Sequence, residues 1–163
     1  MSLKSKVSDA LDLLSASAPG ESEPKTINIE AEGLHLSCEA LEVGPLGCAF
    51  LRFKLQSDTL AGAETARLRE ISEQLSAKLT YLLEAISPIE IDEAGCVVQL
   101  RSNPPHKDEN GTSYYELLVR RGGSLSLCRY NRPKSADRQT ITAHVTREVF
   151  LRLVEDFTAV LRS

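Results

Sequence analysis

The stretch from residue 63 to residue 86 constrains the fold more than any other part of the sequence. Its large apolar residues recur three or four positions apart, which places them on one stripe of an α-helix; they are Leu68, Ile71, Leu75, Leu79, Leu82 and Ile86. Glu64 suits the positive end of the helix dipole, and Pro88 disfavours a helical conformation in the residue before it. We therefore predict a long central helix over residues 63–86, about 34 Å long at roughly 1.5 Å per residue.

Three other segments are predicted to fold as β-hairpins, because each has a glycine-containing turn between two runs of alternating apolar and polar residues. The turns lie at residues 32–33, 94–95 and 122–123, and each sets a register. The expected pairs are Ala31–Leu34, Ile29–Leu36 and Ile27–Cys38 in the first hairpin, Ile91–Val98 and Ile89–Leu100 in the second, and Tyr115–Tyr130, Leu117–Cys128 and Val119–Ser126 in the third.

The chain begins and ends with amphipathic segments that predict two further helices. Residues 3–15 carry an apolar stripe, and Thr146 is a good N-cap for a helix that follows it. We predict a single α+β domain over residues 1–163, with an antiparallel sheet of about six to eight strands in hairpins packed with three helices, in the order α-βββ-α-ββββ(β)-α. The polar segments 16–26, 102–112 and 131–139 are expected to be flexible.

The composition is that of an ordinary globular protein, with 42% hydrophobic residues among 163. No apolar run approaches the ~20 residues of a membrane span, so no membrane partner is expected. Asp9 and Asp12 lie inside the stretch that would have to be apolar in an export signal, so no export signal is expected. The cysteines lie in apolar, strand-like stretches without Cys-x-x-Cys spacing, which predicts free thiols and a cytoplasmic protein; they are Cys38, Cys48, Cys96 and Cys128.

The third hairpin is the candidate interaction surface. In the predicted register one of its faces carries three leucines ringed by polar and cationic groups, and Glu116 lies opposite Arg129. The candidate interface residues are Tyr114, Leu118, Arg120, Leu125, Leu127 and Arg129. Such apolar patches often mark interfaces. We therefore expect a non-catalytic binding protein, whose partner is another polypeptide or a second copy of itself.

Two alternatives remain open from the sequence. Residues 101–138 carry eight Lys or Arg and four Asp or Glu, and arginine interleaved with tyrosine on a sheet can bind single-stranded nucleic acid. The hairpin at 113–132 is therefore a candidate site for nucleic acid or another anionic ligand, although a chain of net charge −4 does not suit a dedicated nucleic-acid binder. A small enzyme with a site built from distant residues is the second alternative.

No cofactor or metal site is predicted. A metal site would need the three histidines to converge with carboxylates, and His35, His106 and His144 are far apart in the sequence. No residue pattern favours a particular nucleophile and base, so no catalytic residue is assigned.

The predicted order of elements resembles that of the class I type III secretion chaperones and their fold relatives. The resemblance extends over residues 3–161, as an order of elements without a residue motif, and the hairpin at 113–132 and the long 102–112 segment depart from the simplest members. The resemblance implies a small acidic homodimer that binds another polypeptide without catalysis, and no functional residue is carried over from it.

Overall fold

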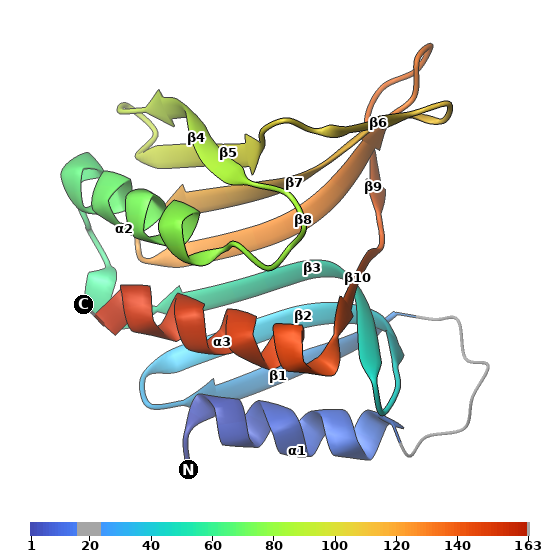
Figure 1. Cartoon of the computed structure of the whole chain (residues 1–163). Helices are drawn as coiled ribbons and strands as arrows, with labels where there is room; N and C mark the ends of the chain where they lie inside the picture. Colours follow the sequence, from blue (N-terminus) through green and yellow to red (C-terminus); the bar gives the residue numbers. More distant parts are fainter. Residues whose placement is uncertain (16–23, 163) are drawn as a thin grey trace.

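The computed structural model describes residues 1–15 and 24–162, in which three α-helices lie on one face of a ten-stranded antiparallel sheet (Figure 1). The predicted α+β class and order of elements are confirmed. The helices are α1 (Leu3–Ser15), α2 (Thr65–Lys78) and α3 (Arg147–Arg162), with a short 3-10 turn at Asp58–Leu60. The strands are β1 (Lys25–Ala31), β2 (Leu34–Val43), β3 (Gly47–Ser57), β4 (Ile86–Asp92), β5 (Val97–Ser102), β6 (His106–Asp108), β7 (Gly111–Arg120), β8 (Ser124–Arg132), β9 (Gln139–Ile141) and β10 (Ala143–Thr146).

Seven strands form the main path of the sheet in the order β1-β2-β3-β8-β7-β5-β4. The two central strands, β3 and β8, pair over only three positions, from Phe53 opposite Leu127 to Leu55 opposite Leu125. Beyond Phe53, β10 takes the place of β8 beside β3, and β9 takes the place of β3 beside β8. The chain from β9 to β10 therefore fills the wedge where the central strands separate (Figure 1).

The core lies between the sheet and a single layer of helices. In that layer α3 lies between α1 and α2 and contacts both, and it packs against β3 and β10. Phe53 of β3 meets Phe150 and Phe157 of α3 edge-on, with ring centres 5.4 and 5.2 Å apart, and Phe50 joins them. Edge-to-face aromatic pairs add to the stabilisation from burial alone. All four rings are fully buried, so the centre of the core lies where α3 crosses β3.

The predicted boundaries are confirmed for the first helix and for the start of the last one. Helix α1 spans residues 3–15 as expected and buries Leu3, Val7 and Leu11. Helix α3 begins after Thr146, whose hydroxyl accepts a hydrogen bond from the backbone N–H of Val149 at 3.1 Å, as an N-cap does.

The predicted central helix over residues 63–86 is wrong in its last third, because α2 ends at Lys78. Leu79 and Leu82 continue the buried stripe without helical structure, and Leu83 has a positive φ of 67° with its side chain 97% exposed. Ile86 already belongs to β4, where its carbonyl accepts the Ser76 hydroxyl at 2.6 Å. The chain leaves the helix to pair β4 with β5 from Ile86 onward, so tertiary context overrides local periodicity.

The first hairpin has the predicted register, with Ala31 opposite Leu34 and Ile27 opposite Cys38. The second hairpin has the predicted Ile91–Val98 pair, but a bulge between Pro88 and Glu90 places Pro88, not Ile89, opposite Leu100. The bulge leaves Ile89 47% exposed. Bulges insert an unpaired residue and turn its side chain away from the regular pattern.

The predicted register of the third hairpin is wrong by one residue. Its loop has three residues, 121–123, so Arg120 lies opposite Ser124 and Leu117 lies opposite Leu127. Both loop glycines have positive φ, and a Cβ on Gly123 would lie 2.9 Å from the Leu60 side chain and 3.1 Å from a backbone oxygen. The loop is also held by a hydrogen bond from the Arg121 N–H to the Cys96 carbonyl at 3.0 Å. Contacts with other parts of the chain, invisible in the local pattern, thus select the longer turn.

Two of the segments expected to be flexible contain strands. In the segment 102–112, β6 pairs with the start of β7, and in the segment 131–139 the chain leaves β8 after Arg132 and enters β9 at Gln139. Residues 25–26 belong to β1, and the rest of the first segment, except Pro24, lies outside the described residues. The short strands β6 and β9 account for the excess over eight strands, because strands of three residues carry little periodic signal. Strand β10 is the optional last strand of the predicted order.

The cysteines are buried free thiols, as predicted. Burial raises the pKa of Cys48 to about 11, against a smaller opposing effect of the Arg147 charge, and burial also raises the pKa of Cys38.

The corrected register yields a test with two matched leucines. Leu127 is fully buried, whereas Leu118 lies half-buried on the opposite face of the sheet. We expect Leu127→Ala to lower the free energy of unfolding by about 2–5 kcal/mol, and Leu118→Ala to lower it by less than about 1 kcal/mol. Urea denaturation measures both, and equal losses would contradict the register.

Candidate functional site

The candidate site is a hollow on the sheet face opposite the helices, and it runs along β8. Its floor is made of the small side chains Ser124, Ser126 and Cys128, which alternate with the buried Leu125 and Leu127. Longer side chains from the neighbouring strands β3 and β7 stand on either side, and the hollow measures about 200 Å³. We call this hollow the trough. Its shape follows from small residues on one strand between large residues on the next two.

Three cations line the trough without an anionic partner. Arg52 and Lys54 come from β3, and Arg120 comes from β7 opposite Ser124. None of the three forms an ion pair with any residue in the described ranges 1–15 and 24–162. Glu39 lies opposite Arg52 in the β2–β3 register, and it too forms no ion pair there. The trough is therefore a cationic surface. The charge of Glu39 acts on Arg52, but no carboxylate of the described chain forms an ion pair with any of the three cations.

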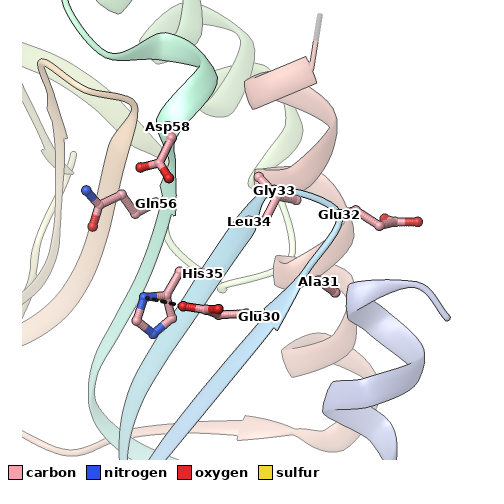
Figure 2. A pocket seen from close by; sticks show the side chains of 8 residues that line it. All are labelled: Glu30, Ala31, Glu32, Gly33, Leu34, His35, Gln56 and Asp58. Atoms are coloured by element: carbon pink, nitrogen blue, oxygen red, sulfur yellow. Dashed lines mark ion pairs between the residues drawn. The ribbon is translucent and has the colours of Figure 1, made fainter.

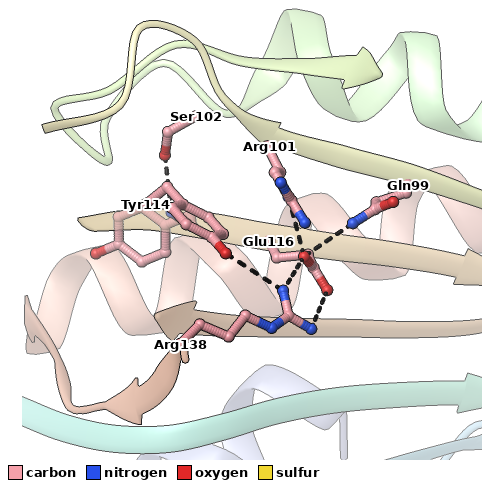
Figure 3. A network of polar contacts seen from close by, with 7 residues as sticks. Gln99, Arg101, Ser102, Tyr114, Glu116 and Arg138 are labelled. Carbon is pink, nitrogen blue, oxygen red and sulfur yellow. Dashed lines mark hydrogen bonds and ion pairs between the residues drawn. The ribbon is translucent and has the colours of Figure 1, made fainter. Parts of the chain in front are cut away.

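One end of the trough is closed by a buried carboxylate and the residues that hold it (Figure 3). The side chain of Glu116 is only 4% exposed. Its Oε2 accepts hydrogen bonds from Arg138 Nη1 at 2.7 Å, Gln99 Nε2 at 2.9 Å and Arg101 Nε at 3.1 Å. We call these four residues the Glu116 cluster. Two guanidinium groups share one carboxylate, so the cluster as a whole keeps a positive charge.

The hydrogen bonds of the cluster favour the ionised carboxylate. Burial by itself acts to raise the pKa of Glu116, but the bonds from Arg138 and Gln99, the charge of Arg138 and the bond from Arg101 outweigh it, and the pKa lies below its ordinary value of 4.5. Glu116 is thus held as an anion at neutral pH, and its charge is already taken up by Arg101 and Arg138.

A guanidinium group also lies over the ring of each tyrosine in the hairpin. The guanidinium carbon of Arg101 lies 4.8 Å from the centre of the Tyr114 ring, and that of Arg138 lies 4.0 Å from the centre of the Tyr130 ring. The rings of Tyr114 and Tyr130 lie beside each other with centres 6.0 Å apart. Tyr115 lies on the helix side of the sheet, 5% exposed, with Arg129 over its ring. Of these three cation–π contacts, that of Arg138 with Tyr130 joins two residues that line the trough.

The six residues predicted as an interface do not share one surface. Leu125 and Leu127 are fully buried in the core beneath the helices, and Arg129 points to the same side, where it pairs with Glu84 at 2.8 Å. Tyr114, Leu118 and Arg120 lie on the opposite face. The predicted cross-strand pair of Glu116 with Arg129 is likewise wrong, because Glu116 lies opposite Cys128. The one-residue change of register explains all of these differences.

Sequence reasoning missed the contribution of β3 to the site. Arg52 and Lys54 belong to the run from Ala49 to Leu55, in which apolar and cationic residues alternate. That alternation indicates a strand with one face outside the core. The positions of both cations on an exposed face could therefore have been predicted, but not their position beside β8, which follows from the pairing of distant strands.

A second hollow, of about 360 Å³, lies at the turn between β1 and β2 (Figure 2). Glu30 Oε1 lies 4.0 Å from His35 Nδ1, and Glu32 points away from both and pairs with Arg162 at 2.6 Å. These side chains are largely exposed, so an ion pair there gains little. His106 lies in β6, which pairs with β7, and His144 lies opposite Ala49, at the end of β3 away from this turn.

The described residues form neither a metal site nor a membrane-spanning helix. Within the described ranges, no three His, Cys, Asp or Glu side chains gather in a way that could hold a metal ion. No helix in those ranges has the length and apolar character that crossing a membrane requires.

No protein-family model, curated protein or solved structure matches the chain. The resemblance to the class I type III secretion chaperones therefore rests on the order of elements alone.

The Glu116 cluster yields a prediction about pH. Glu116→Gln removes the carboxylate and leaves Arg101 and Arg138 without their counter-charge, so we expect it to lower the free energy of unfolding by about 1.5–3 kcal/mol at pH 7. Because the pKa of Glu116 is lowered by folding, this stabilisation is fully present above the ordinary value of 4.5 and is lost as the pH falls through the lowered value.

Chemical denaturation between pH 7 and pH 3 measures this difference. Glu73→Gln is the matched control, because Glu73 is exposed on α2 and forms no ion pair in the described chain. A difference between wild type and Glu116→Gln that persists or grows in acid would contradict the assigned charge state.

Proposed function

We propose that the protein is a non-catalytic binding protein whose trough over β8 binds an acidic segment of another polypeptide. The observation that carries the proposal is the set of three cations, Arg52, Lys54 and Arg120, which surround the trough without an anionic partner in the described chain. Like charges held together on a surface repel one another, so an anionic ligand would relieve a cost that the folded protein carries alone.

The chemistry of the trough suits carboxylates on an extended chain. Guanidinium groups bind carboxylates with two parallel hydrogen bonds, and a lysine ammonium adds a third cationic donor. The floor supplies the hydroxyl groups of Ser124 and Ser126, which can also donate hydrogen bonds. A hollow of about 200 Å³ takes a few side chains rather than a folded domain. Because Arg52 and Arg120 are exposed, we expect weak binding that salt reduces further.

Nucleic acid receives less support as the ligand. Single-stranded nucleic acid is bound largely by stacking of bases on open aromatic rings. Tyr114 is 7% exposed with Arg101 over its ring, and Arg138 covers the ring of Tyr130. The net charge of −4 also opposes a long polyanion.

The homodimer and the cytoplasmic location remain predictions. The predicted interface patch of Leu118, Leu125 and Leu127 does not support a homodimer, because its leucines are divided between the two faces of the sheet.

The proposal is tested with a fluorescein-labelled peptide of ten glutamates and fluorescence anisotropy. Lys54→Glu reverses a charge beside the floor residue Ser126, and we expect it to weaken peptide binding at least tenfold, or about 1.4 kcal/mol. Arg69→Glu is the matched control, since it makes the same charge change at an exposed position of α2 that forms no ion pair within the described residues.

Three outcomes would overturn the proposal. The first is the absence of peptide binding at low salt, and the second is an equal loss in Lys54→Glu and Arg69→Glu, which would indicate net charge alone. The third is that a ten-nucleotide oligo-dT strand binds more tightly than the peptide and that Lys54→Glu abolishes this binding. That result would identify nucleic acid as the ligand of the trough. Circular dichroism of both variants confirms that they are folded.

A further inference from the structure

A separate hollow of about 410 Å³ lies beyond the Glu116 cluster, at the end of the sheet that carries β6. Residues from four strands and one link line it: Ile89 from β4, Arg101 from β5, Pro105 before β6, Thr112 and Tyr114 from β7, and Arg132 from β8. Its volume falls within the roughly 300–1,000 Å³ that is usual for small-molecule sites. We call it the end pocket, and it shares no lining residue with the trough.

The end pocket has two guanidinium groups with unused donors. The Nε of Arg101 donates to Glu116, and its guanidinium carbon lies 4.8 Å from the centre of the Tyr114 ring. The two Nη nitrogens of Arg101 have no hydrogen-bond partner within the described ranges. Figure 3 shows this arrangement of Arg101, Tyr114 and Glu116. Arg132 is exposed, and its side chain has neither an ion pair nor a hydrogen bond in the part of the chain that the structure describes.

The position of Arg132 depends on a close approach of two backbones. Arg132 lies opposite Thr112 in the β7–β8 ladder, next to Gly111. A Cβ on Gly111 would lie 2.3 Å from the carbonyl oxygen of Arg132, so only glycine permits this contact. The glycine thereby brings the last residue of β8 to the rim of the end pocket.

The apolar wall of the end pocket comes from the bulge in β4. Most large apolar side chains of the described chain are buried, whereas the bulge at Pro88–Glu90 leaves Ile89 47% exposed. Bulges that re-aim a side chain are frequent next to functional sites. Pro105 and the ring of Tyr114 complete a lining that is apolar on one side and cationic on the other.

We infer that the end pocket binds a small organic anion, with a carboxylate or phosphate head on an aromatic or aliphatic body. The Nη groups of Arg101 and the guanidinium of Arg132 would hold the head, because guanidinium matches the geometry of both oxyanions. Ile89, Pro105 and Tyr114 would cover the body. This site is independent of the acidic segment proposed for the trough, so the failure of one leaves the other standing.

Ligand-detected NMR with four probes separates the contributions of head and body. Benzoate and phenyl phosphate carry both parts, benzyl alcohol lacks the charge, and acetate lacks the apolar body. We expect benzoate or phenyl phosphate to bind with a dissociation constant of about 1 mM or tighter, and the other two probes to bind at least about tenfold more weakly. The stronger of the two charged probes identifies the head as carboxylate or phosphate.

Three variants assign the binding to the end pocket. Arg132→Gln should weaken the stronger charged probe about tenfold or more, since it removes a charge-assisted hydrogen bond at an exposed position where folding is not at risk. Ile89→Ser should weaken the same probe without changing acetate. Lys54→Glu in the trough and Arg69→Gln on α2 should each change the affinity by less than about twofold, because salt screens distant charges.

Chemical-shift changes in the amide spectrum should centre on residues 101–103, 112–114 and 132. The inference is overturned if none of the probes binds, if benzyl alcohol binds as tightly as the charged probes, or if Arg132→Gln and Arg69→Gln have equal effects. A loss caused by Lys54→Glu but not by Arg132→Gln would also overturn it, because it would place the anion in the trough.

Discussion

The three-residue loop at 121–123 decides which side chains of β8 enter the core and which line the open face of the sheet. Side chains alternate along a strand, so a change of one residue in the loop would exchange the two sets. With this loop, Leu125 and Leu127 pack beneath the helices, and Ser124 and Ser126 form the floor of the trough. The loop is itself selected by the contacts of Gly123 with residues 57 and 60 and by the hydrogen bond of Arg121 to Cys96. The core and the candidate site therefore have one structural origin.

The electrostatics of the open face follow from this arrangement. Glu116 is the one carboxylate among the side chains that line the trough, and Arg101 and Arg138 already neutralise it. The cluster separates the three cations of the trough from Arg132 on the end pocket, and none of these four forms an ion pair in the described chain. A protein with net charge −4 thus presents a local surface of opposite sign. Such a surface favours anionic ligands of limited size over long polyanions, which the acidic remainder of the chain repels.

Local patterns in the sequence predict the elements of this fold better than their ends and partners. The first hairpin and helix α1 have strong periodic signals with well-marked turns, and their predicted positions are confirmed. The prediction of α2 is wrong after Lys78, because Leu79 and Leu82 keep a helical spacing while the chain turns toward β4. The error in the third hairpin has the same character, since two adjacent glycines permit a two-residue or a three-residue loop and only tertiary contacts distinguish them.

The candidate site could be predicted only in part for the same reason. The basic character of residues 101–138 is visible in the sequence, and Arg101, Arg120 and Arg138 do belong to the open face. The pairing of β3 with β8, which brings Arg52 and Lys54 to the trough, joins residues more than 70 positions apart. No periodicity within one strand carries that information.

The core and the candidate site both depend on the register of β7 and β8. Cross-strand nuclear Overhauser effects between Hα protons of opposed residues test this register most directly. In an antiparallel ladder, alternate opposed residues bring their Cα atoms to about 4.5 Å, close enough for strong Hα–Hα signals. The observed register predicts signals within one alternating set of its pairs, which contains either Leu117 with Leu127 or Glu116 with Cys128. Signals that instead connect Leu117 with Cys128 or Tyr115 with Tyr130 would place the leucines of β8 on the open face and contradict the three-residue loop and its register.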